Sequence, residues 1–287
     1  MLFGAKALAV PLKYGQNLNV NASPEKSRIV WTAKEMNETW FAAELGLSDL
    51  SIITTTDHEI ASRLKLLLRS ARELNPDFLS MPVLVETGIN FPRSWGLGTS
   101  STLTANVAAW AGVDPFHLHW KVSSGSGYDV ACALHSSPII YQVTDMVPKM
   151  DRVPFFPSFH EQLYFVYLGE KQDSAKSIAE FHSLHQDRAE SIRQISQITL
   201  EISEAADVVV FMKLLKRHES ILSSNLNLPT VKESLFPDFN GVVKSLGAWG
   251  GDFVMAVSLL PEKKILTYFK TLGYPIIFPY AQMVMPC

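Results

Sequence analysis

The chain has 287 residues, of which 47% are hydrophobic and 18% are charged, so a large apolar core is available and global disorder is excluded. Lys and Arg number 25 against 28 Asp and Glu, a formal net charge of −3, which leaves no basic excess for a phosphate backbone, and we expect no nucleic-acid partner. The two cysteines, Cys132 and Cys287, are too few for a disulfide framework or a Cys-based zinc site and favour a reducing, cytoplasmic compartment.

The first half of the chain carries short apolar runs between polar turns, a pattern that predicts strands. We expect these strands at 7–12, 17–21, 27–32, 39–43 and 83–87. No run of about 18 apolar residues occurs anywhere in the sequence, so we expect no transmembrane helix and no membrane partner. The sequence leaves the oligomeric state open.

Apolar residues at three- and four-residue intervals predict a helix at 57–74. Thr56 or Asp57 would cap its start, and Asn75-Pro76 would end it. A second helix is predicted at 99–111, followed by Gly112, and Pro115 could open a short third helix.

The second half mixes hairpins with helices. Strands are expected at 139–143, 162–168, 253–259 and 275–279, and helices within 176–223 and at 265–272, with Lys216 and His218 near a helix end. The segment 147–159 is rich in Pro and aromatic residues, and we interpret it as the connection between two domains, 1–155 and 156–287. This order of elements favours an α+β fold over a doubly wound sheet.

The first of three glycine-containing segments, Trp95 to Ser101, joins a predicted strand to a predicted helix. Its glycines allow a sharp turn and a close approach to a ligand, and the helix start offers unpaired N–H groups, so the segment suits nucleotide phosphates. It is no Walker A loop, because no Lys follows Gly98, and no dinucleotide fingerprint, because Ser101 stands at the third Gly. An ordinary capped helix after a tight turn is the alternative.

The second segment, Ser123 to Ala131, places Asp129 just after a flexible loop. A carboxylate at such a junction could accept a hydroxyl proton or orient the hydroxyl for attack on a phosphate. The alternative is that Asp129 only caps the next helix. The third segment, Lys244 to Phe253, is a glycine-rich turn that leads into a strand.

Together the three segments resemble the GHMP kinases, a family named for galactokinase, homoserine kinase, mevalonate kinase and phosphomevalonate kinase. Segment 96–101 is similar to the GLGSS phosphate loop, with Thr99 in place of the first Ser, and 125–131 is similar to the stretch that carries the catalytic Asp. Segment 247–252 is similar to the third motif, GAGGG, with Trp249 in place of the middle Gly. The sequences of these motifs are most similar to those of phosphomevalonate kinases.

The resemblance implies an α+β fold with an N-terminal, nucleotide-binding half of ribosomal-S5-like topology and a C-terminal ferredoxin-like half of GHMP type. ATP and Mg²⁺ would be the cofactors. The residues that would cradle the phosphates are Gly96, Leu97, Gly98, Thr99, Ser100 and Ser101, with Ser100 also on Mg²⁺. Asp129 would be the catalytic base or hydroxyl-orienting group. The residues that would bind the acceptor substrate are Gly127, Tyr128, Gly247, Ala248, Gly250 and Gly251.

The implied activity is ATP-dependent transfer of the γ-phosphoryl group to a hydroxyl or phosphate of a small molecule, of mevalonate or phosphomevalonate type. Two alternatives stay open. One is an enzyme similar to diphosphomevalonate decarboxylase, which shares the fold and uses ATP. The other is a nucleotide-binding protein without transfer activity.

The histidines offer a second kind of candidate site. His117 and His119 share a face only in a strand, whereas His182 and His185 could share a helix face. A zinc site needs a third ligand that the sequence does not supply, so these residues are interpreted as surface or packing histidines. A serine hydrolase is disfavoured, because Gly125-Ser126-Gly127 does not extend to Gly-x-Ser-x-Gly.

Overall fold

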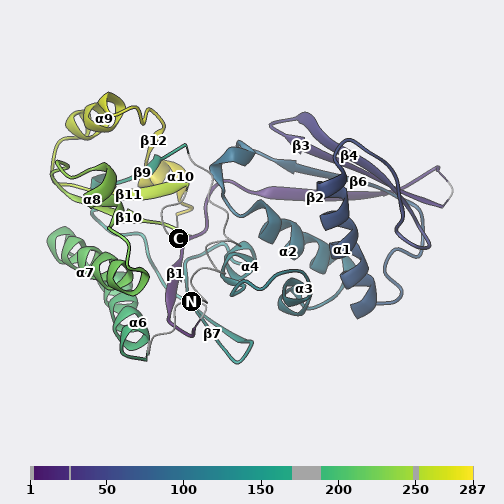
Figure 1. Ribbon diagram of the computed structural model, residues 1–287, viewed down its shortest axis with the longest axis horizontal. Helices are drawn as coiled ribbons and strands as arrows, with labels where there is room; N and C mark the ends of the chain where they lie inside the picture. Colours follow the sequence, from purple (N-terminus) through teal and green to yellow (C-terminus); the bar gives the residue numbers. More distant parts are fainter. Residues whose placement is uncertain (1–2, 26, 170–188, 248–251, 287) are drawn as a thin grey trace. The chain divides into compact units, whose positions relative to one another are not determined.

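The computed structural model describes residues 3–25, 27–169, 189–247 and 252–286 (Figure 1). The chain forms two compact units. Unit 1 takes the described residues of Met1–Lys13, Ser94–Gly96 and His135–Cys287, and unit 2 takes those of Tyr14–Arg93 and Leu97–Leu134. The domain division at residue 155 stays a prediction.

Unit 2 is a five-stranded sheet with helices packed on it. The sheet order is β2-β6-β3-β4-β5, in which the β3–β6 pair is parallel and the other pairs are antiparallel. The strands are β2 (Gln16–Ala22), β3 (Arg28–Glu35), β4 (Glu38–Gly46), β5 (Ile52–Thr55) and β6 (Val83–Ile89). The helices are α1 (His58–Leu74), α2 (Thr99–Ala111), α3 (Pro115–Val122) and α4 (Tyr128–Ala133). Figure 1 shows α1 and α2 on one side of the sheet.

The core of unit 2 follows from the alternation of apolar residues along its strands. In β3, Trp31 and Ala33 point inward and pair in register with Ala43 and Phe41 of β4, which are also buried. Helix α1 lays its apolar stripe into the same core, and α2 and α3 complete it with Val107 and Leu118 among others. Burial of these side chains stabilises the unit that carries the first two glycine segments.

Unit 1 contains two antiparallel sheets. The smaller sheet has the order β1-β7-β8 and the larger β10-β11-β9-β12. Their strands are β1 (Ala7–Ala9), β7 (Ile139–Thr144), β8 (Val147–Arg152), β9 (Leu163–Tyr167), β10 (Val242–Ser245), β11 (Phe253–Val257) and β12 (Ile277–Pro279). The helices are α6 (Ala189–Glu204), α7 (Val208–Leu226), α8 (Val231–Leu235), α9 (Glu262–Thr271) and α10 (Tyr280–Met283).

The larger sheet of unit 1 has a ferredoxin-like arrangement. The first strand, β9, and the third, β11, are neighbours at its centre, and the second, β10, and fourth, β12, lie at its edges. Residues of α8 and α9 pack on one face, where Phe236 contacts Phe269, while Phe165 of β9 stacks on Tyr280 of α10. The α+β fold class and the ferredoxin-like half predicted from the sequence are confirmed.

Two details of the sequence interpretation are wrong. Segment 147–159 begins with β8, which pairs with β7 through a tight turn at Asp145 and Met146, so its first part is a hairpin strand and not a connection. Both turn residues have positive φ angles, 51° and 59°, without being glycine, and the sequence therefore gave no turn signal. Helix α7 extends to Leu226, well beyond the expected end near His218.

The predicted helical stretch 176–188 lies outside the described residues. In the part of the chain that the structure describes, no helix combines the length and the apolar character that a membrane crossing requires.

Candidate functional site

The first glycine segment forms a turn that ends on the start of α2. A short 3₁₀ helix, η1 (Arg93–Trp95), follows β6, and Gly96 and Gly98 then adopt left-handed backbone angles with φ of 64° and 73°. Residues with side chains are strained in this region, so glycine is favoured at both positions. Gly98 is the N-cap of α2 and provides no side chain to bind the first amides. The first turn of α2 therefore presents its N–H groups away from the helix body.

The start of α2 is fixed to the sheet by hydrogen bonds. The Thr102 hydroxyl donates to the Gln16 side chain at 2.6 Å, and the Asn106 amide donates to the Gln16 carbonyl at 3.0 Å. The Thr104 hydroxyl donates back to the Ser100 carbonyl at 2.9 Å. Ser100 itself is exposed, so its hydroxyl faces solvent and not the core. A fixed helix start with an exposed hydroxyl is suited to hold an anion.

Asp129 belongs to the second glycine segment and lies in the first turn of α4, two residues after Gly127. Gly127, with φ of 78°, is the N-cap of this helix, and the Ser126 hydroxyl accepts the Tyr128 N–H at 3.3 Å. The alternative that Asp129 merely caps the helix is therefore wrong, because the cap is two residues earlier. A carboxylate in the first turn also benefits from the positive end of the helix dipole.

Gly98 and the side chain of Asp129 lie side by side in unit 2. A Cβ atom added to Gly98 would lie 3.8 Å from Asp129 Cβ and 3.9 Å from its Cγ, which is ordinary contact distance. Helices α2 and α4, which carry the two residues, pack against each other. Two motifs that are about thirty residues apart in the sequence thus form one surface.

The protein around Asp129 changes its acid–base properties. Its side chain is accessible to solvent, yet desolvation by the surrounding protein raises the pKa of the carboxyl above its ordinary value. Desolvation also raises the pKa of the neighbouring Cys132 thiol to about 12, and the charge of Asp129 adds to this effect. The raised pKa moves Asp129 toward the range that a general base needs at neutral pH.

The third glycine segment lies in unit 1. It follows β10, whose end is held by Glu219 of α7: the Lys244 Nζ donates to Glu219 Oε1 at 3.0 Å and the Ser245 N–H to Oε2 at 3.2 Å. Gly247 comes next, with φ of 61°. Ala248, Trp249, Gly250 and Gly251 lie outside the described residues, so the structure describes one of the four predicted acceptor-side residues in this motif.

Trp95 and Asp252 are two residues near the predicted site that the sequence interpretation missed. The Trp95 ring packs on Phe278 with a centroid distance of 5.1 Å and on Phe253 at 6.0 Å. The Asp252 carboxyl occupies the space beside Gly96 where any side chain would otherwise stand. Trp95, which belongs to unit 1, therefore packs against β11 and β12 of the same unit. The sequence offered two signals for these residues: Trp95 directly precedes the first glycine turn, and Asp252 directly follows the glycines of the third segment.

The predicted site residues thus fall into two groups. Unit 2 contains the first group, which the structure brings together around α2 and α4: Leu97, Gly98, Thr99, Ser100, Ser101, Gly127, Tyr128 and Asp129. Unit 1 contains Gly96 and Gly247.

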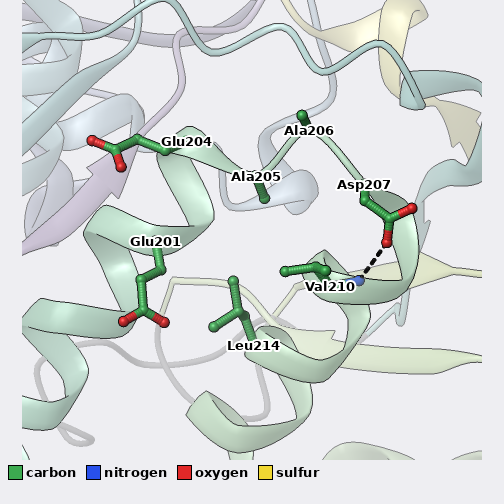
Figure 2. Close-up of a pocket in the computed structure, with 7 residues that line it drawn as sticks. All are labelled: Glu201, Glu204, Ala205, Ala206, Asp207, Val210 and Leu214. Atoms are coloured by element: carbon green, nitrogen blue, oxygen red, sulfur yellow. Dashed lines mark hydrogen bonds between the residues drawn. The ribbon is translucent and has the colours of Figure 1, made fainter.

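A separate surface hollow lies at the turn between α6 and α7 and has a volume of about 380 Å³. Figure 2 shows Val210 and Leu214 of α7 between the carboxylates of Glu201 and Asp207. Asp207 caps α7 by accepting the Val210 N–H at 2.9 Å. Because acidic side chains surround this hollow, it is unsuited to nucleotide phosphates.

Within residues 3–25, 27–169, 189–247 and 252–286, no three His, Cys, Asp or Glu side chains are grouped as a metal site would require. His117 is exposed, whereas His119 is buried. His182 and His185 lie outside the described residues.

The fold built by these elements is known from other proteins, although no family model matches the chain and no curated protein matches its sequence. A Lin0012 protein from Listeria innocua superposes with a TM-score of 0.72 at 16% identity, covering 96% of this chain and 90% of that one. A mevalonate kinase from Methanococcus jannaschii gives 0.65 at 17% identity, with 98% and 92% covered. A Streptococcus pneumoniae phosphomevalonate kinase, in complex with phosphomevalonate and AMPPNP, gives 0.65 at 16% identity, with 95% and 99% covered.

The chain has the fold of the GHMP kinases. The structural similarity extends over nearly the whole chain, and the neighbours include kinases of the mevalonate pathway. Identities of 16–17% show the shared fold alone and do not assign this chain to one member.

Proposed function

We propose that the protein is an ATP-dependent small-molecule kinase. The observation that carries this proposal is the proximity of Gly98, at the start of α2, to Asp129, in the first turn of α4. Phosphoryl transfer requires that phosphates and acceptor be aligned and that charge be neutralised, more than it requires covalent chemistry. A turn that offers backbone amides next to a carboxylate could bind the phosphates, offset their charge and align the acceptor.

The residues at the start of α2 are suited to bind a nucleoside triphosphate. Gly98 lacks a side chain on the surface that faces Asp129, so the backbone is open to a phosphate there. The amides at the start of α2 and the hydroxyls of Thr99, Ser100 and Ser101 would bind the phosphates, with Gly96 and Leu97 shaping the turn. The exposed Ser100 hydroxyl would bind Mg²⁺, which typically takes few protein ligands when phosphates supply the others. ATP would supply the phosphoryl group, and Mg²⁺ would offset its charge.

Asp129 would orient the acceptor hydroxyl and take up its proton at a carboxylate oxygen. The raised pKa of this carboxyl supports the assignment, because a base is most effective when its pKa lies near the working pH. Gly127 and Tyr128, at the start of α4, would contact the acceptor. The assignment of Gly247, Ala248, Gly250 and Gly251 to the acceptor side stays a prediction from the sequence.

The acceptor we propose is a small hydroxy acid or its phosphate monoester, of mevalonate or phosphomevalonate type. Support comes from the wording of the motifs and from the mevalonate and phosphomevalonate kinases among the structural neighbours. A second candidate is a decarboxylase, because a mevalonate diphosphate decarboxylase from Enterococcus faecalis also has this fold.

The proposal is tested by incubating the purified protein with ATP, Mg²⁺ and a panel of mevalonate-pathway and sugar acceptors while ADP, phosphorylated product and CO₂ are measured. We expect ADP and a phosphorylated product in equal amounts, and a fall of about 10²-fold or more in turnover for Asp129→Asn. Nucleotide affinity, measured by calorimetry, should change little in that variant.

Each other outcome assigns a different function. Release of CO₂ with ADP would support the decarboxylase, and tight ATP binding without turnover on any acceptor would support a binding protein. Turnover that is unchanged in Asp129→Asn would remove Asp129 from the mechanism.

A further inference from the structure

His119 is a buried histidine that the predicted phosphate site does not use. It lies on α3, and only 7% of its surface is exposed. Its neighbour on the same helix, His117, is exposed, and its backbone N–H donates to the Asp114 side chain at 2.8 Å. A polar ring is costly to bury without a hydrogen-bond partner, so the partner of His119 indicates what the ring does.

That partner lies in the loop that precedes Asp129. The His119 Nε2 donates to the Gly125 carbonyl oxygen at 3.3 Å. The carbonyl can only accept, so Nε2 carries the proton. A Cβ atom on Gly125 would lie 3.4 Å from Nε2 and 3.3 Å from the Ser123 hydroxyl, which means that the loop backbone packs closely on the ring.

The same loop is held at three further points. The Ser123 N–H donates to the His119 carbonyl at 2.8 Å, and the Gly125 N–H donates to the Ser123 hydroxyl at 3.1 Å. The Tyr128 N–H then donates to the Ser126 hydroxyl at 3.3 Å, one residue before Asp129. Hydrogen bonds therefore hold the loop both at the end of α3 and at the first turn of α4. Among the side chains that make these bonds, Ser123 and Ser126 belong to the loop, whereas His119 belongs to α3.

We propose that His119 is a positioning residue that holds the 123–127 loop and thereby sets the position of the Asp129 carboxylate. This inference rests on the proposed function, because it gives Asp129 a role in transfer. Residues that orient a reacting group act through geometry, and a displacement of about 1 Å can cost about 10²-fold in rate. His119 touches neither phosphate nor acceptor in this arrangement and acts only through the loop.

The test compares His119→Gln with His119→Leu. The glutamine side-chain nitrogen is as many bonds from Cα as the histidine Nε2 and can donate to Gly125, whereas leucine fills the space without a donor. With the acceptor that gives turnover, we expect kcat to fall roughly tenfold or more in His119→Leu and to be largely restored in His119→Gln, while KM for ATP stays the same in both. His117→Leu is the matched control on the same helix, and its kcat should equal that of the unaltered protein.

A second measurement keeps the inference separate from the proposed function. Amide hydrogen exchange, followed by mass spectrometry, should rise in peptides covering 123–130 in His119→Leu but not in His119→Gln, while peptides of α1 stay protected. Unchanged exchange in His119→Leu would overturn the inference even if the protein proved to lack kinase activity. Increased exchange with an unchanged kcat, or an equal fall in kcat for both variants, would also overturn it. Absence of turnover in the unaltered protein would count against the kinase and not against the loop contact.

Discussion

At the scale of single residues, Asp129 and Gly98 form the centre of the proposed site. The pKa of the Asp129 carboxyl is raised by desolvation, so the folded protein holds this proton more tightly than the unfolded chain does. The stability that comes with proton binding is present at low pH and is lost as the pH rises through the folded-state pKa. Desolvation of the Asp129 carboxylate therefore destabilises the fold whenever this group is ionised.

Asp129→Asn should raise the melting temperature at neutral pH, because the amide carries no charge to desolvate. The gain should shrink as the pH is lowered and Asp129 in the unaltered protein becomes protonated. The difference in melting temperature between the two proteins is measured by calorimetry at neutral pH and at successively lower pH values. A melting temperature that is lower in Asp129→Asn at neutral pH would show that the carboxylate is stabilised by its surroundings.

Gly98→Ala separates backbone strain from ligand binding. Its left-handed φ of 73° should cost about 1 kcal/mol in the free energy of unfolding. Gly112, the C-cap of the same helix, has φ of 64° and nothing within 4 Å of an added Cβ, so Gly112→Ala should cost a similar amount. Denaturant unfolding and nucleotide titration of both variants measure the two effects. We expect ATP affinity to fall in Gly98→Ala and not in Gly112→Ala, and equal affinities would contradict the phosphate-loop assignment.

At the scale of elements, the sequence predicted those whose ends carry clear signals. Helix α2 covers the predicted 99–111 because glycines flank it on both sides, and Asp57 caps α1 by accepting the N–H groups of Glu59 and Ile60. Strand β8 was missed because its turn, at Asp145 and Met146, lacks glycine. The packing of Trp95 depends on contacts distant in sequence, which local patterns do not reveal.

The junction of α7 and β10 shows how burial decides the strength of an ion pair. The side chains of Glu219 and Lys244 are only 3% and 14% exposed, so Glu219→Ala leaves a largely buried ammonium without its charged partner and should cost about 3 kcal/mol in the free energy of unfolding. The pair of Glu59 and Arg63 is 76% and 79% exposed, and Glu59→Ala should cost less than about 1 kcal/mol. Urea unfolding of both variants checks this. Similar costs at the two sites would mean that Lys244 finds another partner.

At the scale of the whole molecule, each unit is assembled from segments that are far apart in the sequence. Residues 94–96 pack with unit 1, while the residues on either side of them pack with unit 2. The sequence could predict the motifs and, by resemblance, the fold that joins them. It could not predict that His119 would contact the loop before Asp129. The position of His119 in the sequence, two residues after His117, indicated only a surface or packing role.

The central claim is that the turn at Gly98 and the carboxylate of Asp129 form one phosphate-transfer site. A crystal structure of the protein with AMPPNP and Mg²⁺ tests it most directly. We predict that the phosphates bind the amides at the start of α2 and that the terminal phosphate lies beside Asp129. Nucleotide bound elsewhere, or phosphates that leave the Thr99 and Ser100 amides untouched, would contradict the account.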